Sequence, residues 1–215
     1  MTYALRPAAF DALLTGRTRS FVRDDGRPLL LDAARWRAVA DADDAWLLDR
    51  CTGPTLDLGC GPGRLVAALA ARGVPALGVD SSFVARALCR RRGAAMVCRD
   101  VFGPLPDEGS WAHVLLADGN IGIGGDPVRL LARVAALLVP GGTALVEAGP
   151  EPREFWSGTA QVSGSARRRV GAAVPWACVG AEALCALAGT AGLIPTACSA
   201  TAGGRTFVEL SPVVG

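Results

Sequence analysis

Residues 56–64 of the chain read LDLGCGPGR, with three glycines between a short apolar run and a helical pattern. Glycines at such a junction let the backbone approach a ligand closely, and the N-terminus of the following helix offers N–H groups without partners inside the helix. We therefore predict a ligand-binding loop that includes Gly59, Cys60, Gly61 and Gly63.

Short apolar runs alternate with helical patterns from residue 54 onward. The expected strands cover residues 54–58, 76–79, 94–98, 112–117 and 143–148, and the expected helices cover 64–72, 83–92 and 127–138. This alternation predicts a parallel sheet with helices on both faces. The tail differs, because a helix at 181–188 precedes two strands, at 196–200 and 206–210, which flank the glycine pair 203–204. That pattern predicts an antiparallel hairpin at the end of the sheet.

Two acidic residues stand at the ends of successive expected strands. Asp80 ends the second strand, and Asp100 follows the third. Open α/β sheets bind ligands at the carboxyl ends of their strands, where Asp80 can accept hydrogen bonds from both hydroxyls of a ribose. Asp100 can accept from the exocyclic amine of adenine. The alternative is that each carboxylate caps the helix that follows it.

A dinucleotide-binding loop is a second interpretation of the glycines. Its pattern is G-x-G-x-x-G, with the third glycine where helix and strand pack closely. Counting from Gly59, that position holds Arg64, and the third glycine, Gly63, comes one residue early. A bulky arginine would obstruct that packing, so the spacing disfavours a nicotinamide-dependent enzyme.

On these motifs the chain resembles the class I S-adenosylmethionine-dependent methyltransferases. The resemblance spans about residues 54–210 and includes DLGCGPGR, GVDSS, the Arg99-Asp100 pair and LLVPGGTALVE. The block LLADGNIGIGGDP is similar to a subgroup of bacterial small-molecule-type methyltransferases. The resemblance implies an α/β fold, a Rossmann-like doubly wound sheet of seven strands. Their order would be 3-2-1-4-5-7-6, with the last strand antiparallel.

The resemblance also implies a binding site for S-adenosyl-L-methionine. Asp57 and the glycines would line the methionine half of this cofactor, Asp80 would bind the ribose, and Asp100 and Val101 would hold adenine. The complete expected set is Asp57, Gly59, Cys60, Gly61, Gly63, Asp80, Ser81, Asp100, Val101 and Ala117.

The loop after the fourth expected strand carries the candidate catalytic residues. It contains Asp118 and Asn120, the only Asn of the chain, among several glycines. Methyltransferases often place an acid or His here to orient the acceptor or take its proton, so we expect Asp118 and Asn120 to be the polar groups on the acceptor side. The alternative for Asn120 is a tight turn in which it merely tolerates a left-handed backbone. His113, in the middle of a strand, is expected to be a hydrogen-bonded structural residue.

The composition excludes several kinds of chemistry. All 22 basic residues are Arg, and there is one His among 215 residues, so neither a Schiff-base lysine nor a multi-histidine metal site is possible. GC-rich codon usage accounts for the missing Lys. A net charge of +2 gives no basic excess that would indicate a nucleic-acid partner. We expect no metal, no membrane span and, from seven Cys without a secretory signal, a cytoplasmic protein.

Two segments flank the expected core. Residues 1–50 look helical and are expected to form a cap or lid, and residues 51–215 form the methyltransferase core with an inserted loop at about 150–170. The lid would contribute Trp36, Arg153, Phe155 and Trp156. Aromatic rings beside Arg suit an apolar or a carboxylated substrate.

The sequence therefore predicts an enzyme that transfers a methyl group from S-adenosyl-L-methionine to a small molecule by in-line displacement. Alignment of the nucleophile, the methyl carbon and the sulfur is the main requirement of that reaction. A non-catalytic cofactor-binding or scaffolding protein is the alternative, and a nicotinamide-dependent oxidoreductase is the less favoured one. The oligomeric state is left open.

Overall fold

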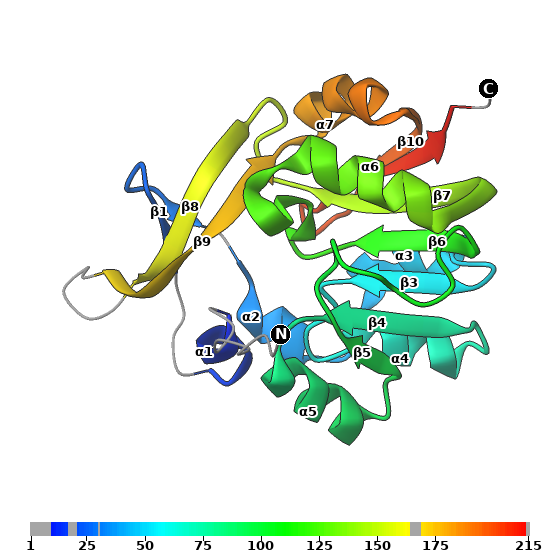
Figure 1. Cartoon of the computed structure of the whole chain (residues 1–215), viewed down its shortest axis with the longest axis horizontal. Helices are drawn as coiled ribbons and strands as arrows, with labels where there is room; N and C mark the ends of the chain where they lie inside the picture. The colour runs from blue at the N-terminus through cyan, green and yellow to red at the C-terminus, as the bar shows by residue number, and fades with distance from the viewer. Residues whose placement is uncertain (1–9, 17–20, 30, 164–168, 214–215) are drawn as a thin grey trace.

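The computed structural model of the chain describes residues 10–16, 21–29, 31–163 and 169–213. A seven-stranded sheet forms its centre (Figure 1). The strands are β3 (Thr55–Leu58), β4 (Ala76–Asp80), β5 (Met96–Cys98), β6 (Trp111–Leu116), β7 (Leu138–Ala148), β10 (Leu193–Ala200) and β11 (Thr206–Pro212). Their order is β5-β4-β3-β6-β7-β11-β10, with β11 antiparallel to both neighbours. The predicted fold class and strand order are confirmed.

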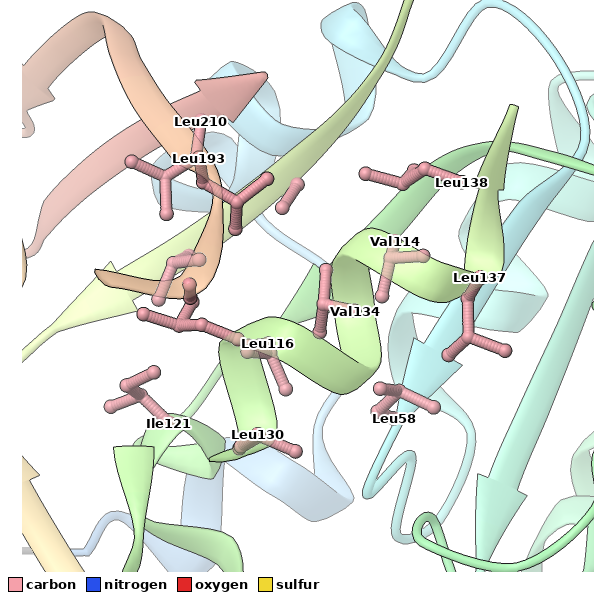
Figure 2. Close-up of a cluster of buried hydrophobic side chains, with 14 of the residues drawn as sticks. Leu58, Val114, Leu116, Ile121, Leu130, Val134, Leu137, Leu138, Leu193 and Leu210 are labelled. Atoms are coloured by element: carbon pink, nitrogen blue, oxygen red, sulfur yellow. The ribbon is translucent and has the colours of Figure 1, made fainter. Parts of the chain in front are cut away.

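Helices cover both faces of this sheet. They are α3 (Ala45–Arg50), α4 (Arg64–Ala71), α5 (Phe83–Arg92), α6 (Pro127–Leu137) and α7 (Ala181–Ala188), with 3₁₀ turns η1 (Ala42–Asp44), η2 (Asn120–Gly125) and η4 (Gly189–Ala191). Along β6, Val114 and Leu116 pack with α6 and α7, whereas Leu115 packs with α3 and α4. Figure 2 shows the core under α6, where Leu130, Val134 and Leu137 approach the sheet. Strands buried on both faces explain the continuous apolar runs of the sequence.

The helix boundaries follow local signals. Ser82 caps α5 by accepting a hydrogen bond from the Ala85 N–H at 3.0 Å, and Gly93 ends the helix in the left-handed region with φ 77°. Asp126 caps α6 in the same way, with Pro127 in the first turn. These signals place the expected helices to within a residue or so of the observed ones.

A second sheet of four antiparallel strands, which we call the lid sheet, has the order β2-β1-β8-β9. It consists of β1 (Phe21–Arg23), β2 (Pro28–Leu29), β8 (Phe155–Ser163) and β9 (Arg169–Val179), and the short helices α1 (Asp11–Leu14) and α2 (Ala33–Arg37) accompany it. In Figure 1 it stands at the left, beyond the carboxyl ends to which the arrows of β3 and β6 point.

The lid sheet corrects two expectations about secondary structure. Residues 1–50 were expected to be helical, yet the described part contains β1 and β2. Residues 150–170 were expected to form a loop, yet β8 and β9 run through that region and on to Val179. The reason is long-range pairing, because Phe21 lies opposite Val162. A three-residue strand has too little alternation to be recognised without that partner.

We predict that Gly180, where β9 returns to the core, tolerates no side chain. A Cβ there would lie 1.9 Å from the Glu151 carbonyl oxygen and 2.5 Å from the Pro152 backbone. Gly180→Ala should lower the free energy of unfolding by about 1–3 kcal/mol because the backbone must shift. Gly189→Ala is the matched control, since its Cβ meets nothing within 4 Å. Urea unfolding measures both, and equal stability of the two variants would contradict the packing described here.

Candidate active site

The glycine loop joins β3 to α4 through left-handed backbone. Gly59, Gly61 and Gly63 have φ values of 77°, 50° and 75°, which other residues adopt only with strain. A Cβ on Gly59 would lie 2.7 Å from the Asn120 amide nitrogen, and one on Gly63 would lie 2.6 Å from the Ala94 Cβ. The loop therefore needs glycine both for its dihedral angles and for the contacts on its back.

The Asp80 carboxylate lies against this loop. It accepts hydrogen bonds from the Gly61 N–H at 3.0 Å and from the Ser82 N–H at 2.8 Å. Burial raises the pKa of Asp80, and these two hydrogen bonds oppose the shift. Ser82, not Asp80, caps α5, so the capping alternative does not apply to Asp80.

Asp100 and Val101 begin a turn after β5. The Asp100 carboxylate accepts from the Phe102 N–H at 3.0 Å, and no helix follows it directly. Arg133 holds the turn by donating to the carbonyl oxygens of Val101 at 3.1 Å and Gly103 at 2.7 Å. The turn is thus held both by the Asp100 carboxylate and by Arg133 of α6.

Asp57 is a buried carboxylate in the middle of the site, with 3% of its surface exposed. Burial raises its pKa from the usual 3.8 to about 7, and the negative charges of Asp118 and Asp80 add to the shift, whereas Arg64 opposes it. A cation placed next to Asp57 would favour its ionised form.

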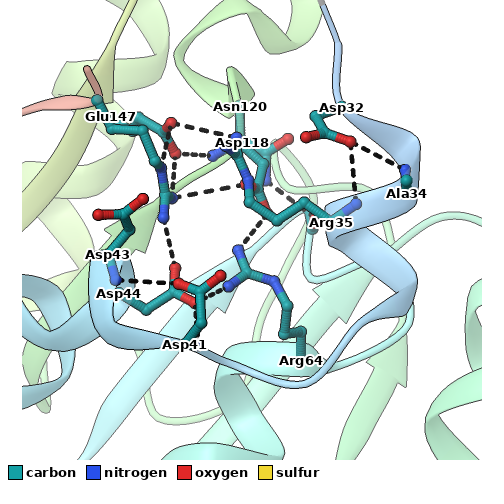
Figure 3. Close-up of polar contacts among 12 residues, drawn as sticks. Asp32, Ala34, Arg35, Asp41, Asp43, Asp44, Arg64, Asp118, Asn120 and Glu147 are labelled. Carbon is teal, nitrogen blue, oxygen red and sulfur yellow. Dashed lines mark hydrogen bonds and ion pairs between the residues drawn. The ribbon is translucent and has the colours of Figure 1, made fainter. Parts of the chain in front are cut away.

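Three arginines and three carboxylates form a buried network below the site (Figure 3). We call this set the charge network; its members are Arg35, Asp44, Arg64, Asp118, Glu147 and Arg205. Asp44 is fully buried and binds both Arg64 and Arg205. Burial opposes the ionisation of Asp44, but the hydrogen bonds from the two guanidinium groups outweigh it and lower its pKa.

Asp118 belongs to this network. Its carboxylate accepts from Arg35 Nε at 3.0 Å and from an Arg64 terminal nitrogen at 2.8 Å, while its N–H donates to Glu147 at 2.6 Å. Its φ is 56°, a left-handed conformation that costs a non-glycine residue about 1–2 kcal/mol. The ion pairs and the Glu147 hydrogen bond hold Asp118 in that conformation.

Asn120 ties two loops together. Its amide nitrogen donates to the carbonyl oxygens of Leu58 at 2.9 Å and Gly59 at 3.0 Å. It therefore does more than tolerate a turn, because it fixes η2 against the glycine loop. Because the amide nitrogen donates to these two carbonyls, the amide oxygen is the atom of Asn120 that is left to bind a ligand, and it can only accept a hydrogen bond.

A cavity of about 1040 Å³ lies between the carboxyl ends of the strands and the lid sheet. Its volume is at the upper end of the range of about 300–1,000 Å³ that is common for small-molecule sites. The predicted site residues that line it are Asp57, Gly59, Cys60, Gly61, Asp80, Ser81, Asp100, Val101, Ala117, Asp118 and Asn120. Gly63 is not a lining residue, because it packs against Ala94 and Cys89.

The aromatic residues expected in the lid separate into two groups. Trp36 lines the cavity. Arg153, Phe155 and Trp156 instead line a second pocket of about 660 Å³, which shares no lining residue with the large cavity. His113 is a structural residue as expected, with Nδ1 2.8 Å from Thr143 Oγ1 and the Thr52 N–H donating to Nε2 at 3.2 Å.

Sequence reasoning missed most of the charge network. Arg35, Asp44, Glu147 and Arg205 were not singled out, although they lie within hydrogen-bond distance of one another or of Asp118. Each comes from a different segment of the chain. The one signal in the sequence was the position of Arg64, which directly follows the glycine loop.

The described residues contain no group of three or more His, Cys or acidic side chains that could hold a metal ion. None of the helices in the described part of the chain combines the length and the apolar character needed to cross a bilayer. Two residues of the arginine run at positions 167–169, Arg167 and Arg168, lie outside the described residues.

The chain is similar to known methyltransferases in part of its sequence and in its fold. Residues 55–142 match the family model of a methyltransferase domain. A SAM-dependent methyltransferase from Bacteroides fragilis, solved with S-adenosyl-L-homocysteine, has a TM-score of 0.74 at 16% identity, over 96% of this chain and 94% of that chain. The CcbJ methyltransferase from Streptomyces caelestis gives a TM-score of 0.62 at 18% identity, over 80% of this chain and 89% of that chain.

A third similar structure contains a substrate. It is the 1,6-didemethyltoxoflavin-N1-methyltransferase from Burkholderia thailandensis with bound 1,6-didemethyltoxoflavin and S-adenosylhomocysteine. Its TM-score is 0.55 at 19% identity, over 75% of this chain and 71% of that chain. No curated protein matches the sequence significantly.

We predict that the charge network depends on Asp44. Asp44→Ala should lower the free energy of unfolding by about 3–5 kcal/mol, because it leaves Arg64 and Arg205 short of a buried counter-charge. Asp49→Ala is the control, since its pair with Arg72 is exposed and should change stability by less than about 1 kcal/mol. Urea unfolding would refute the prediction if the two variants lost the same stability.

The raised pKa of Asp57 predicts a pH-dependent stability. Between pH 4 and 7 the folded chain keeps a proton on Asp57 that the unfolded chain has released, so stability falls as pH rises through that window. The free energy of unfolding of the wild type, relative to that of Asp57→Asn, should therefore fall by at most about 1.4 kcal/mol per pH unit, and should level off above pH 7. Unfolding curves at several pH values measure it, and a constant difference would show that Asp57 titrates normally.

Proposed function

We propose that this chain is an S-adenosylmethionine-dependent methyltransferase and that it methylates a small-molecule acceptor by in-line displacement. The observation that carries the proposal is the single cavity in which the glycine loop, the acids Asp57 and Asp80 and an apolar lid share the walls. The 1,6-didemethyltoxoflavin bound to the Burkholderia enzyme supports a small acceptor on this fold.

The residues of the cavity fit S-adenosylmethionine. Gly61 presents its open side to the cavity, where the nearest atom to an added Cβ would be Leu14 Cδ2 at 3.5 Å. Asp57 offers a buried carboxylate to an ammonium group, and Asp80 offers one to a pair of hydroxyls. When bound, the cofactor supplies a methyl group on a sulfonium that leaves as a neutral thioether. Because this leaving group is neutral, the protein does not need to stabilise a negative charge on it.

We propose that Asp118 and Asn120 act by orientation. The ion pairs with Arg35 and Arg64 fix the position of the Asp118 carboxylate. Asn120 fixes the glycine loop through its amide nitrogen. Both groups line the cavity, so they would hold the reacting partners in line, and alignment is worth several kcal/mol of the barrier.

The partners follow from the same cavity. We propose that the acceptor is not a nucleic acid, because the net charge of +2 provides little sequence-independent attraction to phosphates. We also propose a cytoplasmic location, since the seven cysteines are free in the structure. The oligomeric state is not part of the proposal.

Cofactor binding should depend on Asp80. Asp80→Ala removes a carboxylate acceptor for the two ribose hydroxyls and should weaken S-adenosylhomocysteine binding by at least about 10–100-fold, because one hydrogen bond to a charged group is already worth about 1.5–3 kcal/mol. Calorimetry measures the affinity, with Asp49→Ala as an acidic control outside the cavity. Unchanged binding by Asp80→Ala would remove Asp80 from the site.

Turnover tests the class of acceptor. The protein is incubated with methyl-labelled S-adenosylmethionine and a cell extract separated into small molecules, nucleic acids and proteins. We expect the label to enter the small-molecule fraction. Label in the protein or nucleic-acid fraction would replace the proposal, and cofactor binding without any transfer would favour a scaffolding role.

A further inference from the structure

The lid side of the cavity is apolar. Its larger lining residues come from α1, α2, η2 and β9, and they are Phe10, Leu14, Trp36, Ile123, Val174 and Trp176. Leu14 and Trp176 are buried, and Val174 is half-buried. These side chains line the same cavity as the acids of the core, and we take them as the wall against which an acceptor would lie.

The aromatic rings of this wall are held in fixed positions. Phe10 stacks on Phe21 with 4.8 Å between ring centroids and 10° between planes. It also lies against Trp176 at 4.7 Å and 49°. Because Phe21 is 1% exposed in the core of the lid sheet, the lid sheet supports the rings from behind. Aromatic surfaces of this kind bind ring systems by offset or tilted contacts.

The described lid residues bring no charge into the cavity. The charged lining residues all come from the core, and they are Asp57, Arg64, Asp80, Arg99, Asp100 and Asp118. Four of the six are acids. Arg64 is 3% exposed and its two terminal nitrogens bind Asp44 and Asp118, so its charge is already balanced by two carboxylates.

Arg153, which the sequence suggested for a carboxylated substrate, lies elsewhere. Its side chain is 87% exposed, pairs with Glu182 and borders the second pocket. Neither Arg153 nor Phe155 reaches the large cavity. The arrangement of aromatic rings beside an arginine is therefore not present where the acceptor would bind.

We propose that the acceptor is an uncharged compound with an apolar ring system, and that anionic acceptors are excluded. This inference rests on the proposed function. A carboxylate on the lid side would lose its hydration and meet apolar rings, with no guanidinium among the described lid residues that line the cavity. The Arg99 guanidinium belongs to the other end of the cavity, because Arg99 follows β5 next to Asp100. A neutral ring loses little hydration there and gains contact with the aromatic wall.

Matched probes test the proposal in the complex with S-adenosylhomocysteine. One pair is 2-naphthol and 6-hydroxy-2-naphthoate, and the other is indole and indole-5-carboxylate. Titration calorimetry should show that each neutral probe binds at least tenfold more tightly than its carboxylate. Equal or tighter binding of the carboxylates would overturn the proposal, and so would failure of both neutral probes to bind. Absence of S-adenosylhomocysteine binding would instead count against the proposed function.

Substitution of Val174 tests whether the apolar lid wall causes the preference for neutral probes. Val174→Glu should weaken neutral-probe binding at least tenfold, and Val174→Arg should reverse the order within each pair. Both variants should keep wild-type affinity for S-adenosylhomocysteine, which also verifies that they are folded. Val39→Glu is the control, since Val39 is 81% exposed and outside the cavity. An unchanged order of affinities in Val174→Arg would show that the probes bind elsewhere.

Discussion

The charge network is the constraint on which the rest of the site depends. Asp44 is fully buried, and burial of an unpaired charge costs several kcal/mol, so its two guanidinium partners must stay in place. Arg64 starts the helix after the glycine loop, and Arg205 follows the turn before the last strand. One carboxylate thus fixes two distant segments. The arginine-only composition suits this arrangement, because Arg205 donates to Glu147 through two nitrogens and to Asp44 through a third, which a lysine ammonium could not match in geometry.

The cofactor site is built on this support. Asp118, held in a left-handed conformation, lies between the network and the cavity, and Asn120 fastens the next turn to the glycine loop. The two polar side chains that we propose for the acceptor side, Asp118 and Asn120, are therefore held by fixed partners. Such rigidity suits a reaction in which direction matters more than acid–base strength. The described residues of the lid sheet that line the cavity carry no charge, whereas the charged lining residues come from the core.

The sequence was informative where the chemistry is local. The glycine loop, the Ser and Asp caps of α5 and α6, and Asp80 at the end of its strand depend on neighbours within a few residues, and the strand order followed from the family resemblance. The lid sheet could not be predicted, because β1 has three residues and its partner lies about 140 positions away. The charge network could not be predicted for the same reason, because its members come from distant segments of the chain. Arg23 and Arg205 look alike in a sequence, yet one contacts Glu154 in the lid and the other Glu147 in the core.

The pairing of β1 with β8 has a consequence for how the protein is made. The ribosome releases residues 21–23 long before residues 160–162, their partners in the sheet. Until then the N-terminal strand has no neighbour on that side, and closing so long a loop carries an entropic cost that local helices do not have. The core strands β3, β4, β5 and β6 emerge in between and can assemble first. The binding cavity is therefore expected to be completed last, so that ligand-binding competence reports the folding of the whole chain.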